Sequence, residues 1–218
     1  MTRTIATIAL SIVCAQSCAT VGVPAGSGHP SGGAASSAPP AGLTAEQVPQ
    51  FVHFGFDDNG VSGRQGSGTV GGLTFVTRLF AGKTNPVGKG NRRTYDGTSA
   101  RFSFYVVTRY LEQQELDTPE HVKRQWRAAV ETGHEIGIHT HSHPHGEPFT
   151  AEQWSEEIAI CRDWLTRPFD VDRAADRDIG LGMQAADVSG FRAPYLEYGP
   201  PLFPALRGAG LSYDCSIE

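Results

Sequence analysis

The sequence predicts an α/β fold with a mostly parallel sheet. From about residue 51 onward, short runs rich in aromatic and β-branched residues alternate with longer segments that carry an apolar residue every three or four positions. The short runs are typical of buried strands, and the longer segments are typical of helices that cover a sheet. Strands that alternate with helices indicate parallel pairing, because each helix returns the chain to the edge where the next strand starts.

Five segments are predicted to form strands. They span residues 51–56, 102–107, 135–139, 190–192 and 211–217. The first run meets Asp57-Asp58-Asn59-Gly60, which is a turn sequence, and Pro194 ends the fourth run. Each of the three clusters discussed below therefore follows the end of a predicted strand.

Four segments are predicted to form helices. They span residues 69–80, 119–132, 151–167 and 202–207. The second begins with Pro119 after the capping residue Thr118, and the third opens with a capping box formed by Thr150 and Gln153. Residues 82–98 are polar and glycine-rich, which predicts a long loop.

The first 49 residues predict export rather than a folded domain. Residues 1–18 resemble a signal peptide, with an apolar run too short for a stop-transfer helix. Residues 19–49 are rich in Gly, Ser, Ala and Pro, which predicts an unfolded linker before a domain at residues 50–218. Cleavage before Cys18 would allow lipid attachment there, and simple secretion is the alternative. We therefore expect a periplasmic, cell-surface or secreted protein.

Composition excludes some partners and leaves one question about the cysteines open. The net charge is −5, with 18 basic and 23 acidic residues, which gives no reason to expect nucleic acid or an anionic membrane surface as a partner.

In an oxidising compartment Cys161 and Cys215 can form a disulfide. Two free buried thiols are equally compatible with the sequence.

Three polar clusters carry the candidate chemistry. They are the acid pair Asp57-Asp58, the alternating histidines His139, His141, His143 and His145, and the arginine of Arg192-Ala193-Pro194-Tyr195. Alternating histidines suggest a metal site, and residues four apart share a side if the chain curls after the strand. Each cluster also has a plain interpretation: a solvated turn, a histidine-rich loop and a surface arginine.

Together the three clusters resemble the motifs of the polysaccharide deacetylase family with the NodB-homology domain, carbohydrate esterase family four. The matching segments are Phe56-Asp57-Asp58, His139-Thr140-x-x-His143 and Arg192-Ala193-Pro194-Tyr195, in the family's order. Three flanking segments are similar to its chitin-deacetylase-like branch: residues 133–137, 83–86 and 211–214. The resemblance implies a distorted (β/α) barrel, incomplete here with about five strands.

The resemblance also implies a reaction and a role for each residue. One divalent metal, commonly zinc, would bind Asp58, His139 and His143. Asp57 would act as the general base, Arg192 would keep it ionised, and the backbone N–H of Tyr195 would hold the oxyanion. Family substrates are N-acetylated polysaccharides such as chitin or peptidoglycan, with some esterases of acetylated xylan.

One departure from the family pattern changes the expectation for this chain. The family's catalytic acid is a histidine beyond the third motif, and no histidine follows His145. We therefore expect a chain truncated at its C-terminus and impaired in catalysis. Two alternatives remain: a non-catalytic carbohydrate-binding protein, and an exported metal-binding protein that uses His141 and His145 in place of His139 and His143.

Overall fold

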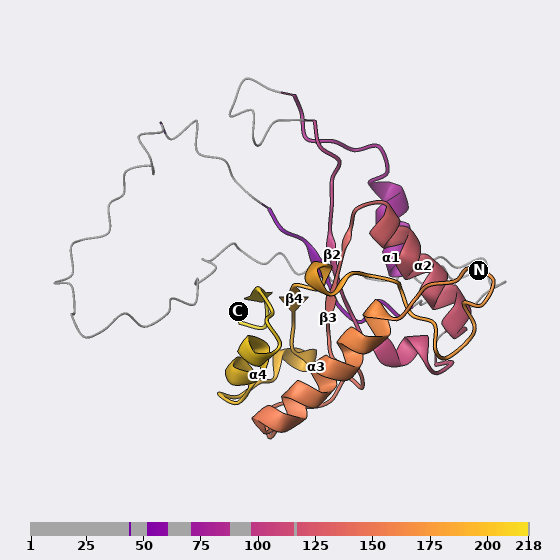
Figure 1. The fold of residues 1–218 in the computed structure, drawn as a ribbon. Helices are drawn as coiled ribbons and strands as arrows, with labels where there is room; N and C mark the ends of the chain where they lie inside the picture. The colour runs from indigo at the N-terminus through magenta and orange to yellow at the C-terminus, as the bar shows by residue number, and fades with distance from the viewer. Residues whose placement is uncertain (1–43, 45–51, 61–70, 88–96, 116, 218) are drawn as a thin grey trace, which may run out of the picture. The chain divides into compact units, whose positions relative to one another are not determined.

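The core of the fold is a sheet of five parallel strands in sequence order, as Figure 1 shows in part. The strands are β1 (Gly55–Phe56), β2 (Ser103–Val106), β3 (Glu135–Ile138), β4 (Gly190–Phe191) and β5 (Tyr213–Asp214). All four neighbouring pairs are parallel. Consecutive parallel strands with intervening helices are the arrangement of a (β/α) barrel, which closes with eight strands. The predicted α/β fold and incomplete barrel of about five strands are therefore confirmed.

The computed structural model describes residues 44, 52–60, 71–87, 97–115 and 117–217. The predicted signal peptide, Cys18 and all but one residue of the predicted linker lie outside these ranges. No helix in the described ranges is both long and apolar enough to cross a membrane. Residues 53–217 form one compact unit.

Among the described residues, four α-helices connect and cover the strands. They are α1 (Gly72–Leu79), α2 (Pro119–Glu131), α3 (Ala151–Thr166) and α4 (Leu202–Gly208). Short 3-10 helices add η3 (Thr108–Leu111), η4 (Ala185–Asp187) and η5 (Pro194–Leu196). Both predicted caps are present: Thr118 accepts a hydrogen bond from the backbone of His121, and Thr150 with Gln153 forms a capping box. In Figure 1, α1 lies beside α2 and α3 beside α4.

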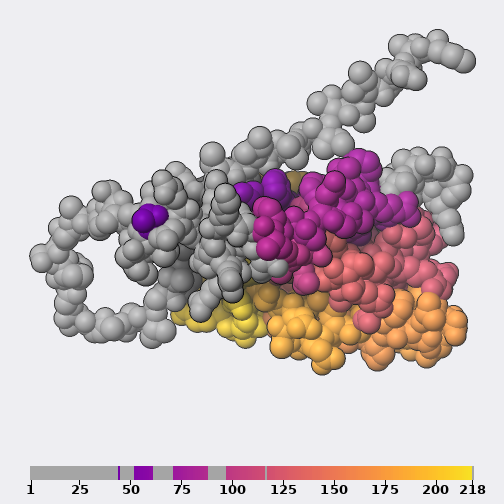
Figure 2. Space-filling view, turned by 90° about the horizontal axis from the view of Figure 1, so that it is seen from above, coloured from indigo at the N-terminus to yellow at the C-terminus, as the bar shows by residue number. Residues whose placement is uncertain are grey.

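Alternation along the strands gives the sheet an apolar face and a polar face. The apolar face buries Phe104, Val106, Ile136, Ile138 and Phe191 completely. Helices α2 and α3 pack on it through buried side chains at helical spacing: Val122, Trp126, Ala129, Trp154, Ile158, Cys161 and Leu165. In Figure 2 the magenta-to-rose residues of α1 and α2 adjoin the orange-to-yellow residues of the C-terminal half.

The other face of the sheet carries hydrogen-bonded polar side chains. Ser103 bonds to His53 Nε2 at 2.8 Å and donates to Glu135, and Ser189 Oγ donates to Glu135 Oε1 at 3.2 Å. The hydroxyl of Tyr105 reaches Cys215 Sγ at 3.3 Å. Because polar groups removed from water need partners, this network makes a polar sheet face tolerable.

Several predicted elements were too long, most of all the first and fifth strands. The predicted strands 51–56 and 211–217 shorten to Gly55–Phe56 and Tyr213–Asp214. Each has one neighbouring strand in the described sheet, so pairing extends only as far as that neighbour. The Cys161–Cys215 disulfide is not formed: Cys161 is buried on α3 and directed at the carbonyl of Val106, whereas Cys215 follows β5 on the polar face.

Candidate metal centre

The parallel register brings the three clusters to one edge of the sheet. Asp57 follows the last residue of β1, His139 follows the last residue of β3, and Arg192 follows the last residue of β4. The carboxyl ends of parallel strands meet at the same edge, which is where ligands bind in such folds. Segments separated by more than 130 residues in sequence thus become neighbours.

The acid pair is held by a turn that the structure anchors through Asn59. Asp58 and Asn59 both adopt positive φ, 61° and 48°. The Asn59 amide donates to the carbonyls of Phe56 at 2.6 Å and Tyr105 at 3.0 Å. Trp126 Nε1 in turn donates to the Asn59 carbonyl at 3.0 Å. This tight turn lets Asp57 and Asp58 both face the sheet edge, so the interpretation as a merely solvated turn does not hold.

The histidine loop directs His139 and His143 to the same point. His139 is buried, and its Nδ1 lies 2.7 Å from the carbonyl of Arg192. Because a carbonyl accepts, Nδ1 carries the proton, and the lone pair of Nε2 is available to a metal. Thr140 and His143 have positive φ values of 69° and 57°. Thr140 Oγ1 accepts a hydrogen bond from the His143 backbone at 3.1 Å, which closes the turn. The two imidazole centroids are 5.1 Å apart.

Asp58 completes a cluster that fits a divalent metal. Asp58 Oδ1 lies 2.9 Å from His143 Nε2 and 3.6 Å from His139 Nε2, and the three atoms lie within 4.8 Å of one another. An ion about 2.1 Å from each of three tetrahedral ligands separates those ligands by about 3.4 Å. The distances of 2.9 and 3.6 Å bracket that value. Two imidazoles and one carboxylate also form a common catalytic zinc set.

The electrostatics of the cluster favour the protonation states that metal ligands need. The hydrogen bond from His143 lowers the pKa of Asp58 below its ordinary value of 3.8. Burial lowers the pKa of His139 below its ordinary value of 6.5. At neutral pH an ionised carboxylate and a neutral imidazole are therefore present, as metal binding requires.

Arg192 pairs with the second acid, Asp57. Its Nη1 donates to Asp57 Oδ1 at 2.9 Å, and its Nε donates to the carbonyl of Cys215 at 3.1 Å. The guanidinium lies 4.9 Å from the ring centroid of Tyr105. Three contacts therefore hold this cation in place, and its interpretation as an ordinary surface arginine does not hold.

Tyr195 lies next to the cluster in a strained conformation. Its φ is 56°, and its exposed ring stacks on His145 at 4.1 Å and meets the His143 ring edge-on at 4.5 Å. His145 Nδ1 also lies 2.9 Å from Glu197 Oε2. The predicted oxyanion-binding residue thus borders one of the metal-ligand candidates.

His141 points away from the cluster. Its Nδ1 lies 3.1 Å from Thr108 Oγ1, and its Nε2 lies 3.4 Å from Glu112 Oε2. Within the described residues, the one group of at least three acidic, histidine or cysteine side chains able to hold a metal is Asp58, His139 and His143. The sequence pattern missed the supporting residue Asn59, because it lies outside the three motifs and its amide bonds to the backbone carbonyls of Phe56 and Tyr105.

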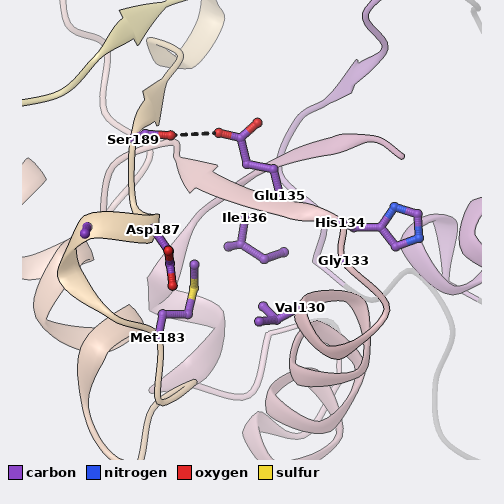
Figure 3. Close-up of a pocket in the computed structure, with 9 residues that line it drawn as sticks. Val130, Gly133, His134, Glu135, Ile136, Met183, Asp187 and Ser189 are labelled. Atoms are coloured by element: carbon purple, nitrogen blue, oxygen red, sulfur yellow. Dashed lines mark hydrogen bonds between the residues drawn. The ribbon is translucent and has the colours of Figure 1, made fainter. Parts of the chain in front are cut away.

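A cavity of about 410 Å³ lies at the opposite edge of the sheet (Figure 3). Its polar wall includes Glu135, which is hydrogen-bonded to Ser189, and His134, whose Nδ1 accepts from the Phe102 backbone at 3.2 Å. Val130, Ile136 and Met183 form its apolar wall. Glu135 and His134 are thus engaged within the fold, and the candidate chemistry remains at the carboxyl ends of the strands.

A comparison with protein families finds a match in the middle of the chain. Residues 94–175 match the family model described as polysaccharide deacetylase. This segment contains His139 and His143, whereas Asp57, Asp58 and Arg192 lie outside it. The resemblance to this family is confirmed, and the chitin-deacetylase-like branch stays a prediction. No curated protein sequence matches the chain.

Solved structures of carbohydrate esterase family four are also similar to the chain. An acetyl xylan esterase from Clostridium thermocellum with a cobalt ion shares 22% identity at a TM-score of 0.41, covering 70% of this chain and 53% of its own. A family 4 carbohydrate esterase from Streptomyces lividans in complex with acetate shares 19% sequence identity at a TM-score of 0.42. That match covers 74% of this chain and 59% of the esterase chain. A family pseudoenzyme from Bacillus anthracis shares 10% sequence identity at a TM-score of 0.42, and the match covers 74% of this chain and 41% of the pseudoenzyme chain. The chain thus spans 41 to 59% of the length of these proteins.

Proposed function

Taking the polysaccharide deacetylase match over residues 94–175 as the premise, we propose that this chain carries the metal centre of a polysaccharide N-deacetylase. Asp58, His139 and His143 are the proposed ligands of one divalent ion, with zinc the expected metal. The proposed substrate is an N-acetylated extracellular polymer of the chitin or peptidoglycan type. The predicted signal peptide at residues 1–18 supports a site of action outside the cytoplasm.

The convergence of three distant segments is the observation that carries the proposal. It joins the Asp58 carboxylate, the two imidazoles and the Arg192–Asp57 pair at one sheet edge. All six described non-glycine residues with positive φ also lie in these segments: Asp58, Asn59, Thr140, His143, Tyr195 and Leu196. Such conformations cost about 1–3 kcal/mol each and cluster at functional sites.

The side chains around the centre support amide hydrolysis. A bound divalent ion would polarise the acetyl carbonyl and acidify a water. Asp57 is the proposed acceptor of the proton from the attacking water, and Arg192 orients its carboxylate through a charge-assisted contact of 2.9 Å. His139 donates its Nδ1 proton to the carbonyl of Arg192, which leaves its Nε2 lone pair available to a metal. The Tyr195 backbone N–H is the proposed donor to the developing oxyanion.

Two other functions compete with this proposal. An exported metal-binding protein that uses His141 and His145 is disfavoured, because these side chains contact Glu112 and Glu197 and are not part of the cluster. A non-catalytic carbohydrate-binding protein would have no need of the ion pair between Arg192 and Asp57. That pair therefore favours catalysis.

Metal titration of matched histidine variants tests the proposal. We expect His143→Ala to weaken zinc binding at least about 100-fold in calorimetry, because it removes one of three ligands, and His141→Ala to change it less than about threefold. The reverse order would overturn the proposal and favour the metal-binding protein.

Asp57→Asn tests the catalytic part separately. Its metal affinity should match the unmodified chain. The unmodified chain is expected to release acetate from an N-acetylglucosamine oligomer only slowly, and Asp57→Asn should lower that residual rate at least about 100-fold. Equal acetate release by both proteins would contradict the role of Asp57. Metal binding without any acetate release by the unmodified chain would favour the non-catalytic alternative.

A further inference from the structure

Glu157 on helix α3 makes three hydrogen bonds to the loop that joins the two metal-ligand histidines. Its Oε2 accepts from the backbone N–H groups of His141 at 2.8 Å and Ser142 at 2.9 Å. Its Oε1 accepts from Ser142 Oγ at 2.6 Å. One carboxylate therefore binds both residues at the centre of the loop.

The same loop is bound from η3 through a group of opposite charge. Arg109 Nη1 donates to the carbonyl of Ser142 at 2.9 Å, and the Arg109 backbone donates to the carbonyl of His141 at 3.0 Å. Glu157 thus engages the donors of this loop, and Arg109 engages its acceptors. The peptide groups between Thr140 and His143 are held from both sides.

The loop needs this support because it contains two strained residues. Thr140 and His143 adopt positive φ, and left-handed backbone costs a non-glycine residue about 1–2 kcal/mol. Relaxation of either residue to negative φ would rotate the His143 side chain away from Asp58. Metal affinity therefore depends on the contacts that oppose this relaxation.

We propose that Glu157 is a positioning residue that holds His143 in its metal-binding orientation. The inference rests on the proposed metal centre. Glu157 does not touch the ligand atoms and acts through the loop backbone. Its neighbours Ile158 and Trp154 bury against the core, so α3 is a rigid support for the carboxylate.

Three variants separate positioning from folding. Glu157→Ala removes all three acceptor contacts. Glu157→Gln can keep all three, because its carbonyl oxygen can accept from the two N–H groups while its amide donates to Ser142 Oγ with the hydroxyl reversed. Glu156→Ala is the matched control, since Glu156 precedes Glu157 on the same helix and is exposed.

The test measures zinc affinity by calorimetry at a temperature where the metal-free proteins remain folded by circular dichroism. Supporting contacts around metal ligands contribute about 10–100-fold to metal affinity. We expect a loss of that size in Glu157→Ala, a loss below about fivefold in Glu157→Gln and no change in Glu156→Ala. The visible spectrum of the cobalt(II)-loaded proteins adds a readout of ligand geometry and should change only in Glu157→Ala.

The possible results are distinguishable. Folded Glu157→Ala with wild-type affinity and spectrum would overturn the inference while leaving the metal centre intact. Absence of zinc binding in the unmodified chain would instead overturn the proposed function. If Glu157→Ala does not fold, Ser142→Ala removes one of the three contacts. A loss of about threefold would then support the inference, and unchanged affinity would refute it.

Discussion

Replacement of Asn59 by alanine should loosen the turn that carries Asp58. The Asn59 side chain is about nine-tenths buried and donates to two backbone carbonyls, those of Phe56 and Tyr105. These bonds tie the end of β1 to β2. Alanine removes both donors and leaves the two carbonyls without this partner. It must also adopt the φ of 48° that asparagine tolerates more easily.

The expected loss of stability follows from these three effects. A hydrogen bond contributes about 1 kcal/mol net, so the two bonds account for about 2 kcal/mol. The left-handed backbone adds about 1 kcal/mol for alanine. The free energy of unfolding should therefore fall by about 3 kcal/mol. Metal affinity should fall about tenfold, because Asp58 is the adjacent residue and loses its fixed orientation.

Urea unfolding monitored by circular dichroism measures the first effect, and zinc calorimetry measures the second. Asn85→Ala is the matched control, because Asn85 is exposed and its amide makes one exposed contact, to Thr98 Oγ1 at 3.0 Å. Its unfolding free energy should change by less than about 1 kcal/mol. If Asn59→Ala loses no more stability than Asn85→Ala, the reasoning about this turn is wrong.

Two further predictions concern pH and the arginine. Burial lowers the pKa of His53, His134, His139 and His141 below 6.5, so the unfolded chain binds more protons than the folded chain just below that pH. The urea concentration at the unfolding midpoint of the metal-free protein should therefore decrease as the pH is lowered from 7 to 5. A midpoint that stays constant or increases would contradict this. Arg192→Lys should lower acetate release at least about tenfold, because a lysine ammonium cannot donate to Asp57 and to the Cys215 carbonyl with the geometry of a guanidinium. Metal affinity should stay within about threefold. Unchanged kinetics would exclude the proposed role of Arg192 in holding Asp57.

The sequence alone determined the features that depend on local periodicity and capping. Strand and helix positions followed from spacing, because residues two apart share a strand face and residues three or four apart share a helix face. The caps at Thr118 and Thr150 were predictable for the same reason, since their hydrogen bonds span three residues. The edge positions of the clusters followed from their place after predicted strands.

Only the tertiary structure decided which polar residues meet. The sequence left open whether His139 and His143 or His141 and His145 converge, and backbone conformation at Thr140 and His143 decided it. The Arg192–Asp57 contact spans 135 residues and exists because β1 to β5 align in register. The supports from Asn59 and Glu157 cross between elements in the same way. Such contacts depend on how strands and helices pack, which no local pattern encodes.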